Sequence, residues 1–380
     1  MFVGITNTPR DYAWGSTTAI PELLGVAPTG APQAELWLGA HPGSPSRLVG
    51  RDGTLADIVP GRLPFLLKVL AASAPLSLQA HPTPEQARAG FERENAAGIP
   101  LDAPERNYKD PFHKPELIYA LSDPFTALSG FRPVADTRAV LEPVAGDARL
   151  EPLMARLVDD GSLREVFSWL ISRGPGVDDV ISAVVEAAAV VDGPSWETVR
   201  LLAEYYPGDP GIPISLLLHT IALRPGEVLY LPAGNIHAYL GGLGIELMAA
   251  SDNVLRGGLT PKHVDVAELL EVLDFRPLPA PYLAGVEVAP GVREFRPDVP
   301  DFVLTVVSPD AAVAGADVAI PDGGPAIAFV ASGTFLLTGS SESQTLDRGS
   351  AVYVTAELTL RVEGDGQVFV ATAGGHAARL

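Results

Sequence analysis

Hydrophobic and polar positions alternate differently along the chain and divide it into three parts. Short strand-like runs predict strands at 2–5, 35–40, 64–70, 75–81 and 110–121, and the last two alternate with a period of two residues. Between residues 133 and 206 the hydrophobic period becomes that of amphipathic helices, with Gly or Pro at the joins. Strand-like runs return from residue 214 to the end. We therefore expect a mainly β fold with an α-helical insertion.

The helices have recognisable start signals. Pro84 after Thr83, with Gln86 three residues beyond Thr83, predicts a helix over 84–97. A second helix is expected from Thr260-Pro261 to about Asp274, and it would carry Lys262. Inside the insertion we expect helices at 135–141, 150–158, 162–172 and 177–191, and a fifth one capped by Ser195.

Residues 226–256 contain the strongest turn signal. Two strand-like runs, 226–231 and 236–240, flank Pro232-Ala233-Gly234-Asn235, which predicts a β-hairpin that presents His237. Taken alone, a histidine after a turn is more often a solvated hairpin residue than a metal ligand. His237 therefore needs partners from elsewhere in the chain.

Two of the expected strands offer such partners. Period two in 75–81 separates the apolar Leu76, Leu78 and Ala80 from the polar Ser77, Gln79 and His81. The same period puts Lys114 and Glu116 on one face of the run 110–121. A polar inner face is costly unless a ligand or a neighbour satisfies it, which favours a site. The alternatives are a solvent-facing edge strand and a surface ion pair.

Composition limits the kinds of function. The chain has 380 residues, of which 47% are hydrophobic, so it can form two or three compact units. Its net charge of −20 argues against binding to nucleic acid or to an anionic membrane. Neither a basic leader nor a long uninterrupted apolar run is visible. We expect a soluble cytoplasmic protein.

The absence of cysteine restricts any metal to imidazole, carboxylate and amide ligands. Gln79, His81, Glu116 and His237 come from three expected strands, and one small barrel could bring them together. Two imidazoles, one carboxylate and one amide oxygen suit a borderline divalent ion. Zinc is favoured, with manganese, iron or cobalt as alternatives.

The motifs around these residues resemble known ones. The spacing Gly-x5-Pro-x-Gly-x2-His that ends at His237 resembles a metal-binding motif of the cupin superfamily. More specifically, PFLLKVL, SLQAHP, DPFHKPELIYAL, the histidine of NIHAY, and MAASDNVLRGGLTPKHVD resemble the signature segments of type I mannose-6-phosphate isomerases (phosphomannose isomerases). The resemblance covers roughly residues 10–132 and 205–275.

The resemblance implies an activity and roles for residues. The family interconverts mannose 6-phosphate and fructose 6-phosphate through an enediolate, with one zinc per chain on Gln, His, Glu and His, which here are Gln79, His81, Glu116 and His237. The lysine of the HKPE motif falls on Lys114, an acid or base, and His113 beside it would face the other way. The charge pair of the SDNVLR motif falls on Asp252 and Arg256, with Asp252 orienting Arg256. Contacts to the substrate are expected from Lys68, Ser77 and Lys262.

The resemblance also implies an architecture of two cupin-like β-barrels of the jelly-roll type plus a helical domain. We expect a catalytic barrel from 1–132 and 207–275, the helical domain at 133–206, and a C-terminal barrel at 276–380. The C-terminal barrel has Leu360 where the first has His237, so no metal site is expected there. Two other functions remain open, a metal-dependent cupin dioxygenase and a non-catalytic sugar-phosphate-binding cupin. The expected partner is a hexose phosphate, and the chain is expected to be a monomer.

Overall fold

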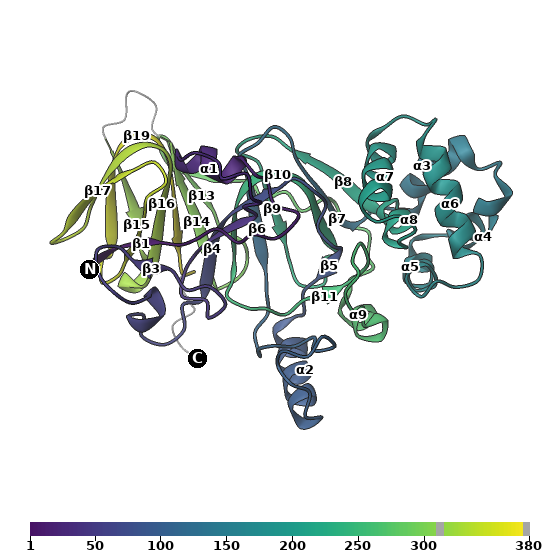
Figure 1. The fold of residues 1–380 in the computed structure, drawn as a ribbon, viewed down its shortest axis with the longest axis horizontal. Helices are drawn as coiled ribbons and strands as arrows, with labels where there is room; N and C mark the ends of the chain where they lie inside the picture. The colour runs from purple at the N-terminus through teal and green to yellow at the C-terminus, as the bar shows by residue number, and fades with distance from the viewer. Residues whose placement is uncertain (309–314, 375–380) are drawn as a thin grey trace.

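Two antiparallel sheets and a group of helices make up the protein. The computed structural model describes residues 1–308 and 315–374. In Figure 1 the sheets lie side by side, and most of the helices form a separate group beyond one of them. The expected mainly β fold with a helical insertion is confirmed.

The first sheet contains the strands that hold the expected site residues. Its longest strand, β10, pairs with β5 and β7 near its beginning and with β4 and β6 from Gly242 onward. Gly242 has a φ of 123°, a conformation that lets the strand bend between these two sets of partners. The strands of this sheet are β2 (Glu35–Leu38), β4 (Phe65–Ala72), β5 (Gln79–Ala80), β6 (Glu116–Ala120), β7 (Phe125–Phe131), β8 (Leu218–Leu223), β9 (Val228–Leu231), β10 (His237–Ala249) and β11 (Leu255–Arg256).

The expected β-hairpin at residues 226–240 is wrong in its pairing. Strand β6 lies between β9 and β10, since Glu116 pairs with Leu231 on one side and with Met248 on the other. The turn before β10 is held by other segments, because Gly234 N donates to His81 O at 2.9 Å. Turn chemistry therefore located the reversal correctly but not the strands that it joins.

The strand expected at residues 75–81 is shorter than its pattern indicated. Only Gln79–Ala80 is a strand, β5, and it pairs with β10 and β11. Leu76 N donates to Tyr239 O at 2.8 Å, so the residues that precede β5 also lie beside β10. The strand expected at residues 64–70 corresponds to β4 (Phe65–Ala72), which pairs with β2 and β10.

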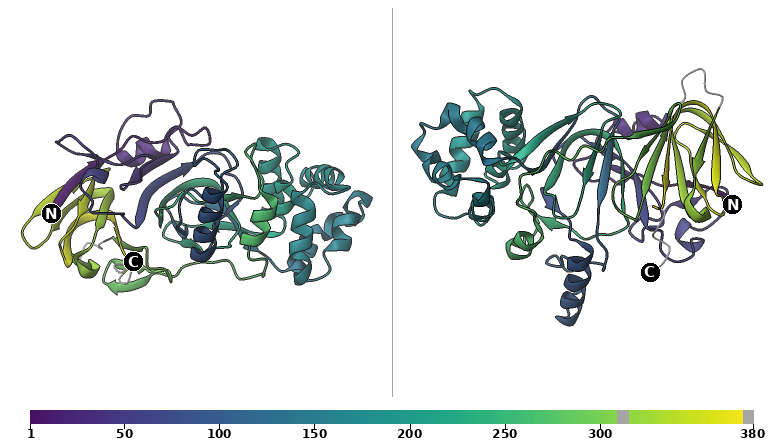
Figure 2. Two further views of the ribbon diagram at one scale, coloured as in Figure 1. Left: turned by 90° about the horizontal axis from the view of Figure 1, so that it is seen from below. Right: turned by 180° about the vertical axis from the view of Figure 1, so that it is seen from behind.

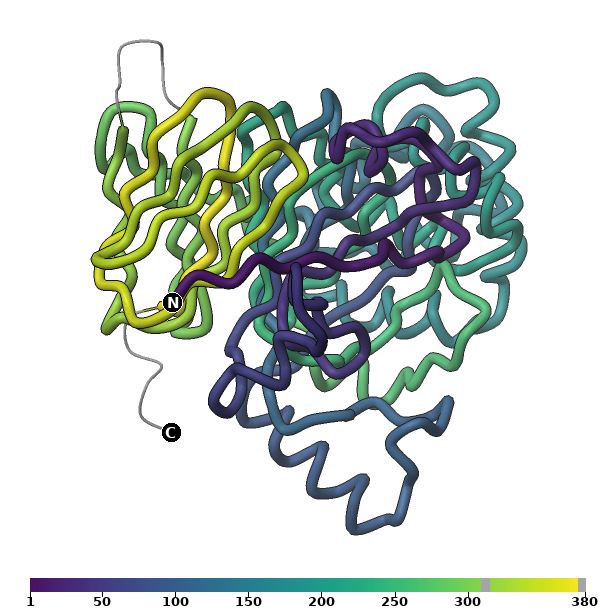
Figure 3. Tube along the Cα trace, turned by 60° about the vertical axis from the view of Figure 1, so that its left-hand side comes forward, coloured from purple at the N-terminus to yellow at the C-terminus, as the bar shows by residue number. Residues whose placement is uncertain are grey.

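The second sheet combines both ends of the chain. Strand β1 pairs with β18 and β3 pairs with β1, although we expected residues 1–132 to lie wholly in the catalytic barrel. Figure 3 shows the N-terminal segment running from the C-terminal strands across to the first sheet. The strands are β1 (Phe2–Thr6), β3 (Arg47–Leu48), β12 (Val286–Ala289), β13 (Val292–Phe295), β14 (Val303–Val307), β15 (Ala316–Ala319), β16 (Ala326–Thr338), β17 (Ser343–Asp347), β18 (Ala351–Val354) and β19 (Thr359–Thr372).

A shared hydrophobic core joins the two sheets. Val69 and Ile245 of the first sheet belong to the same buried cluster as Phe329 and Phe369 of the second. Tyr119 of β6 packs edge-on against Phe369, with ring centroids 5.0 Å apart. The strand that begins at Glu116 is therefore supported from the C-terminal side.

The helical insertion extends further than residue 206, because α8 covers Gly211–Ser215. The fifth helix is capped by Gly193 with Pro194 in its first turn, so the expected Ser195 cap is wrong. Figure 2 shows this group at one end of the molecule. The insertion contains α3 (Val134–Leu141), α4 (Glu151–Arg156), α5 (Leu163–Ile171), α6 (Val177–Ala188), α7 (Pro194–Tyr205) and α8.

The remaining helices connect strands. Helix α2 (Pro84–Ala96) has the expected capping box, since Thr83 Oγ1 accepts from Gln86 N and Gln86 Oε1 accepts from Thr83 N. Helix α9 (Val266–Val272) is capped by Asp265, so Lys262 precedes it rather than lying in it. The third is α1 (Ala19–Leu24). Within residues 1–308 and 315–374, no helix combines the length and hydropathy required to cross a bilayer.

Candidate metal centre

Three of the expected metal ligands meet inside the first sheet. His81 follows β5, Glu116 begins β6 and His237 begins β10, and each residue is only 1% exposed. One candidate ligand atom from each lies within 4.8 Å of the others. The motifs therefore predicted residues that the fold brings together, although His81 and His237 are 156 positions apart in the sequence.

Hydrogen bonds fix how both imidazoles present their ring nitrogens. His81 Nδ1 donates to Asn253 O at 2.7 Å, and His237 Nδ1 donates to Asn235 O at 3.0 Å. Each Nε2 then carries a lone pair toward Glu116, 3.5 Å from Oε1 for His81 and 3.4 Å from Oε2 for His237. These contacts place acceptors against acceptors, so we do not count them as hydrogen bonds.

The three groups consequently need a cation. In the part of the chain that the structure describes, both Nε2 atoms and Glu116 Oε2 are buried without a hydrogen-bond partner. Buried polar atoms without partners are destabilising, whereas a divalent ion would bind all three at once. Carbonyl groups that orient the far side of each imidazole are the usual outer support of such sites. The residues present therefore fit zinc.

Charge at the centre also favours metal binding. Burial lowers the pKa of His81 to about 4, which keeps the imidazole neutral at pH 7, as a ligand requires. Burial opposes ionisation of Glu116, but the positive charge of Lys114 outweighs it and holds the pKa of this carboxyl well below its usual range. Glu116 is therefore an anion at neutral pH.

Gln79, the expected fourth ligand, lies directly beside this centre. It pairs across the sheet with His237 on β10 and with Arg256 on β11. Residues opposite each other in antiparallel strands have their side chains on the same face. The amide of Gln79 and the guanidinium of Arg256 thus extend on the face from which His237 reaches the centre.

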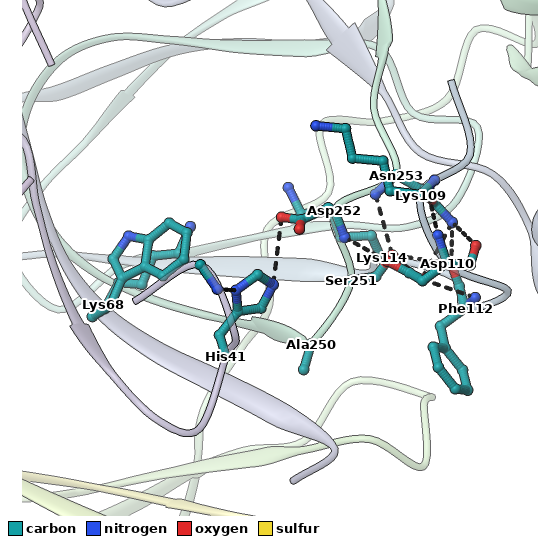
Figure 4. Close-up of polar contacts among 12 residues, drawn as sticks. His41, Lys68, Lys109, Asp110, Phe112, Lys114, Ala250, Ser251, Asp252 and Asn253 are labelled. Carbon is teal, nitrogen blue, oxygen red and sulfur yellow. Dashed lines mark hydrogen bonds and ion pairs between the residues drawn. The ribbon is translucent and has the colours of Figure 1, made fainter. Parts of the chain in front are cut away.

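Lys114 also reaches the centre, and its Nζ lies 2.8 Å from Glu116 Oε1. The preceding loop is held by a fully buried asparagine, Asn253, whose side chain accepts from Lys109 N at 2.7 Å and donates to Phe112 O at 2.8 Å. Figure 4 shows this network beside Asp252. Sequence reasoning missed Asn253, although it stands within the SDNVLR motif and its own carbonyl orients His81.

The expected pair of Asp252 and Arg256 is not formed. Asp252 Oδ1 instead lies 3.4 Å from His41 Nε2, as Figure 4 shows. Among the described residues, Arg256 has no carboxylate within ion-pair distance, and burial lowers its pKa. Arg256 lies in β11, where it pairs with Gln79 of β5. His41 lies in the loop after β2 and was missed because nothing in the sequence connects it to Asp252.

The three expected substrate contacts have different surroundings. Lys68 is 6% exposed, with Nζ 2.8 Å from Glu246 Oε2 and 3.4 Å from Glu35 Oε1. Burial would lower its pKa, but these two carboxylates outweigh burial and raise it. A lysine neutralised by two acids is poorly placed to bind phosphate, which speaks against that expectation. Lys262 is exposed, and Ser77 is half-buried in the segment that leads to Gln79.

Comparisons with known proteins give the family. Residues 2–134 match the description "phosphomannose isomerase type I, catalytic domain". The chain is 39% identical to the mannose-6-phosphate isomerase of Salmonella typhimurium over 386 residues, which cover 96% of this chain and 97% of the relative. It is 30% identical to the human enzyme, with 93% of each chain covered. The chain belongs to the type I phosphomannose isomerase family.

Solved structures of this family agree with the fold and the site. Salmonella typhimurium mannose-6-phosphate isomerase bound to fructose 6-phosphate and zinc superposes with a TM-score of 0.89 at 37% identity, covering 98% of this chain and 99% of the other. A zinc-bound mannose 6-phosphate isomerase gives a TM-score of 0.88. The expected family, enzyme class and zinc cofactor are confirmed. The dioxygenase and the non-catalytic sugar-binding protein are not supported.

Proposed function

We propose that this chain interconverts mannose 6-phosphate and fructose 6-phosphate, with one zinc held by Gln79, His81, Glu116 and His237. The observation that carries the proposal is the set of buried ligand atoms without partners, which point at one another inside the first sheet. When bound, the zinc supplies positive charge that stabilises a developing oxyanion. The relative with bound fructose 6-phosphate supports this substrate class.

Lys114 is the residue that we assign to proton transfer. Isomerisation moves one proton between C2 and C1 of the open sugar through an enediolate, so a single base beside these carbons suffices. Lys114 Nζ lies 2.8 Å from Glu116 Oε1, next to the metal ligands and only 8% exposed. Asp252, whose side chain is 47% exposed, offers a second acid or base at the open side of the site.

Arg256 and Lys262 are suited to hold the anionic end of the substrate. Burial lowers the pKa of both, and for Lys262 the nearby charges of Arg256 and Lys109 lower it further. Neither has a carboxylate within ion-pair distance among the described residues, so their charges oppose each other without compensation. A phosphate relieves this repulsion and accepts a paired set of bonds from a guanidinium. Ser77 would add a hydroxyl from the segment before Gln79.

We extend the proposal to the organisation of the chain. The metal centre belongs to a catalytic unit formed mainly by residues within 1–132 and 207–275. The helices from residue 133 form a second unit, and residues 276–380 form a third, whose described residues include none of the proposed ligands. We further propose that the enzyme is a cytoplasmic monomer. Size-exclusion chromatography with light scattering tests the oligomeric state.

The decisive experiment is a coupled assay of mannose 6-phosphate conversion before and after chelation. We expect turnover to disappear with the zinc and to return when zinc is added back, with one zinc per chain by elemental analysis. Binding of hexose phosphate without turnover would instead identify a sugar-phosphate sensor. Oxygen consumption with bound iron would identify a dioxygenase.

A further inference from the structure

The loop that carries Lys114 has an unexpected partner in the C-terminal unit. His113 Nε2 lies 2.6 Å from Asp301 Oδ2, and the two side chains are 16% and 10% exposed. Asp301 stands just before β14 (Val303–Val307), outside the segments that carry the proposed metal ligands. A nearly buried contact therefore connects the C-terminal unit to the residue next to Lys114.

Each part of this loop is held from a different direction. Its first part is held within the first sheet, since Asn253 Nδ2 donates to Phe112 O at 2.8 Å. Lys114 is drawn toward the metal ligands by Glu116 Oε1 at 2.8 Å. Between these anchors, Asp301 is the one polar partner of the His113 side chain within the residues that the structure describes. Without Asp301, the His113 side chain would lose this partner, and the segment would be held only at its two ends, by Asn253 and by the ion pair of Lys114 with Glu116.

Asp301 is itself fixed in place. The next residue, Phe302, is fully buried in the core shared by the two sheets. Asp301 is 7% exposed, so its carboxylate has little access to water that could replace His113. Since a misplacement of about 1 Å at a catalytic group can cost on the order of 10²-fold in rate, a fixed anchor at this position has kinetic consequences.

We infer that Asp301 is a positioning residue of the isomerase: through His113 it holds the Lys114 loop at the metal centre. Among the described residues, Asp301 has no hydrogen bond or ion pair with the metal ligands or with Lys114, so the route that we assign runs through His113. The inference rests on the proton-transfer role proposed for Lys114. It also gives the C-terminal unit a part in turnover, although none of the proposed metal ligands lies in the described part of that unit.

The test compares Asp301→Asn and Asp301→Ala with Asp298→Asn. Asp298 is exposed and lies three residues earlier in the sequence. Asp298→Asn therefore removes one negative charge, as Asp301→Asn does, but at the surface and without breaking the contact to His113. For Asp301→Asn we expect full zinc content, a KM within about twofold of wild type, and a kcat lower by about 10-fold to 100-fold. Asp301→Glu, which keeps the carboxylate, should recover part of the rate, and Asp298→Asn should behave like wild type.

A double-mutant cycle shows whether Asp301 acts through His113. If it does, the combination of Asp301→Asn with His113→Gln loses no more rate than the more damaging single variant. Independent, multiplying losses would overturn the inference, as would a wild-type kcat in Asp301→Asn. A loss of kcat in proportion to lost zinc or lost folded protein would also overturn it, because Asp301 would then be merely structural. Wild-type turnover in Lys114→Met would instead refute the role proposed for Lys114.

Discussion

Lys114 is the residue whose removal separates proton transfer from metal binding. In Lys114→Met the side chain keeps its length but loses its amine, while the two imidazoles and Glu116 remain to hold zinc. We expect full zinc content and a kcat reduced by roughly 10²-fold to 10⁴-fold, the usual contribution of a placed acid or base. Arg256→Ala should mainly raise KM if Arg256 holds the phosphate.

Proton exchange provides the direct measurement. Exchange of the C2 proton of the substrate with D₂O, followed by NMR, should slow in Lys114→Met in parallel with kcat. Wild-type exchange in this variant would remove Lys114 from proton transfer and would leave Asp252 or His113 as the candidates. Zinc analysis of the same samples excludes a trivial loss of the metal.

At the scale of single residues, the sequence identified those that local motifs specify. Gln79, His81, Glu116, Lys114 and His237 stand in short motifs whose residue types already indicate their chemistry, and the fold brings them to one place. Partners from distant loops were not visible, because no periodicity links His41 to Asp252 or His113 to Asp301. For the same reason, the sequence did not show that two buried carboxylates pair with Lys68, which we had expected to contact the substrate.

Among the elements, β10 has the greatest influence on the site, since it carries His237 and pairs on both sides along its length. The bend at Gly242 makes this possible, and an added Cβ there would lie 2.7 Å from Ser122 Oγ and 2.8 Å from Phe125 Cδ2. At the neighbouring Gly241, the nearest atom to an added Cβ is Thr126 Oγ1 at 3.6 Å. Gly241 therefore serves as the control for Gly242, because the two are neighbours in β10 and differ in the space around an added Cβ.

We expect Gly242→Ala to lower the free energy of unfolding by roughly 2–5 kcal/mol, through backbone strain at positive φ together with overpacking. Because His237 begins the same strand, zinc should also bind less tightly. Gly241→Ala should have little effect on either quantity. Thermal unfolding and zinc titration of both variants test this, and equal behaviour of the two would show that the bend does not depend on Gly242.

At the scale of elements, the sequence predicted where most strands lie but not how they pair. Alternation and turn residues located most strands to within a few residues, and the capping box located α2 correctly. Pairing depends on contacts between distant segments, so the pattern could not show that β6 would insert between β9 and β10. It likewise could not show that β1 would join the sheet formed by the end of the chain.

For the molecule as a whole, the main question is whether the two sheets unfold together. Phe369 lies in the core that both sheets share and contacts Tyr119 of β6, whereas Phe335 lies in a cluster formed by the second sheet. Both phenylalanines are fully buried. Truncation of either residue to Ala should lower the free energy of unfolding by about 3–5 kcal/mol. Because the two losses are similar, a difference in local exchange between the variants will reflect where each cavity lies.

We expect Phe369→Ala to increase hydrogen exchange in β6, the strand that begins with Glu116, and Phe335→Ala to leave β6 protected. The reason is that the Phe369 cavity removes support from Tyr119, whose hydroxyl also accepts from Gln367 Nε2 at 3.1 Å. Hydrogen exchange followed by mass spectrometry resolves these segments. If β6 remained protected in both variants, the sheets would open independently. The positioning of Lys114 by Asp301 would then depend on the contact with His113 and not on the core that the two sheets share.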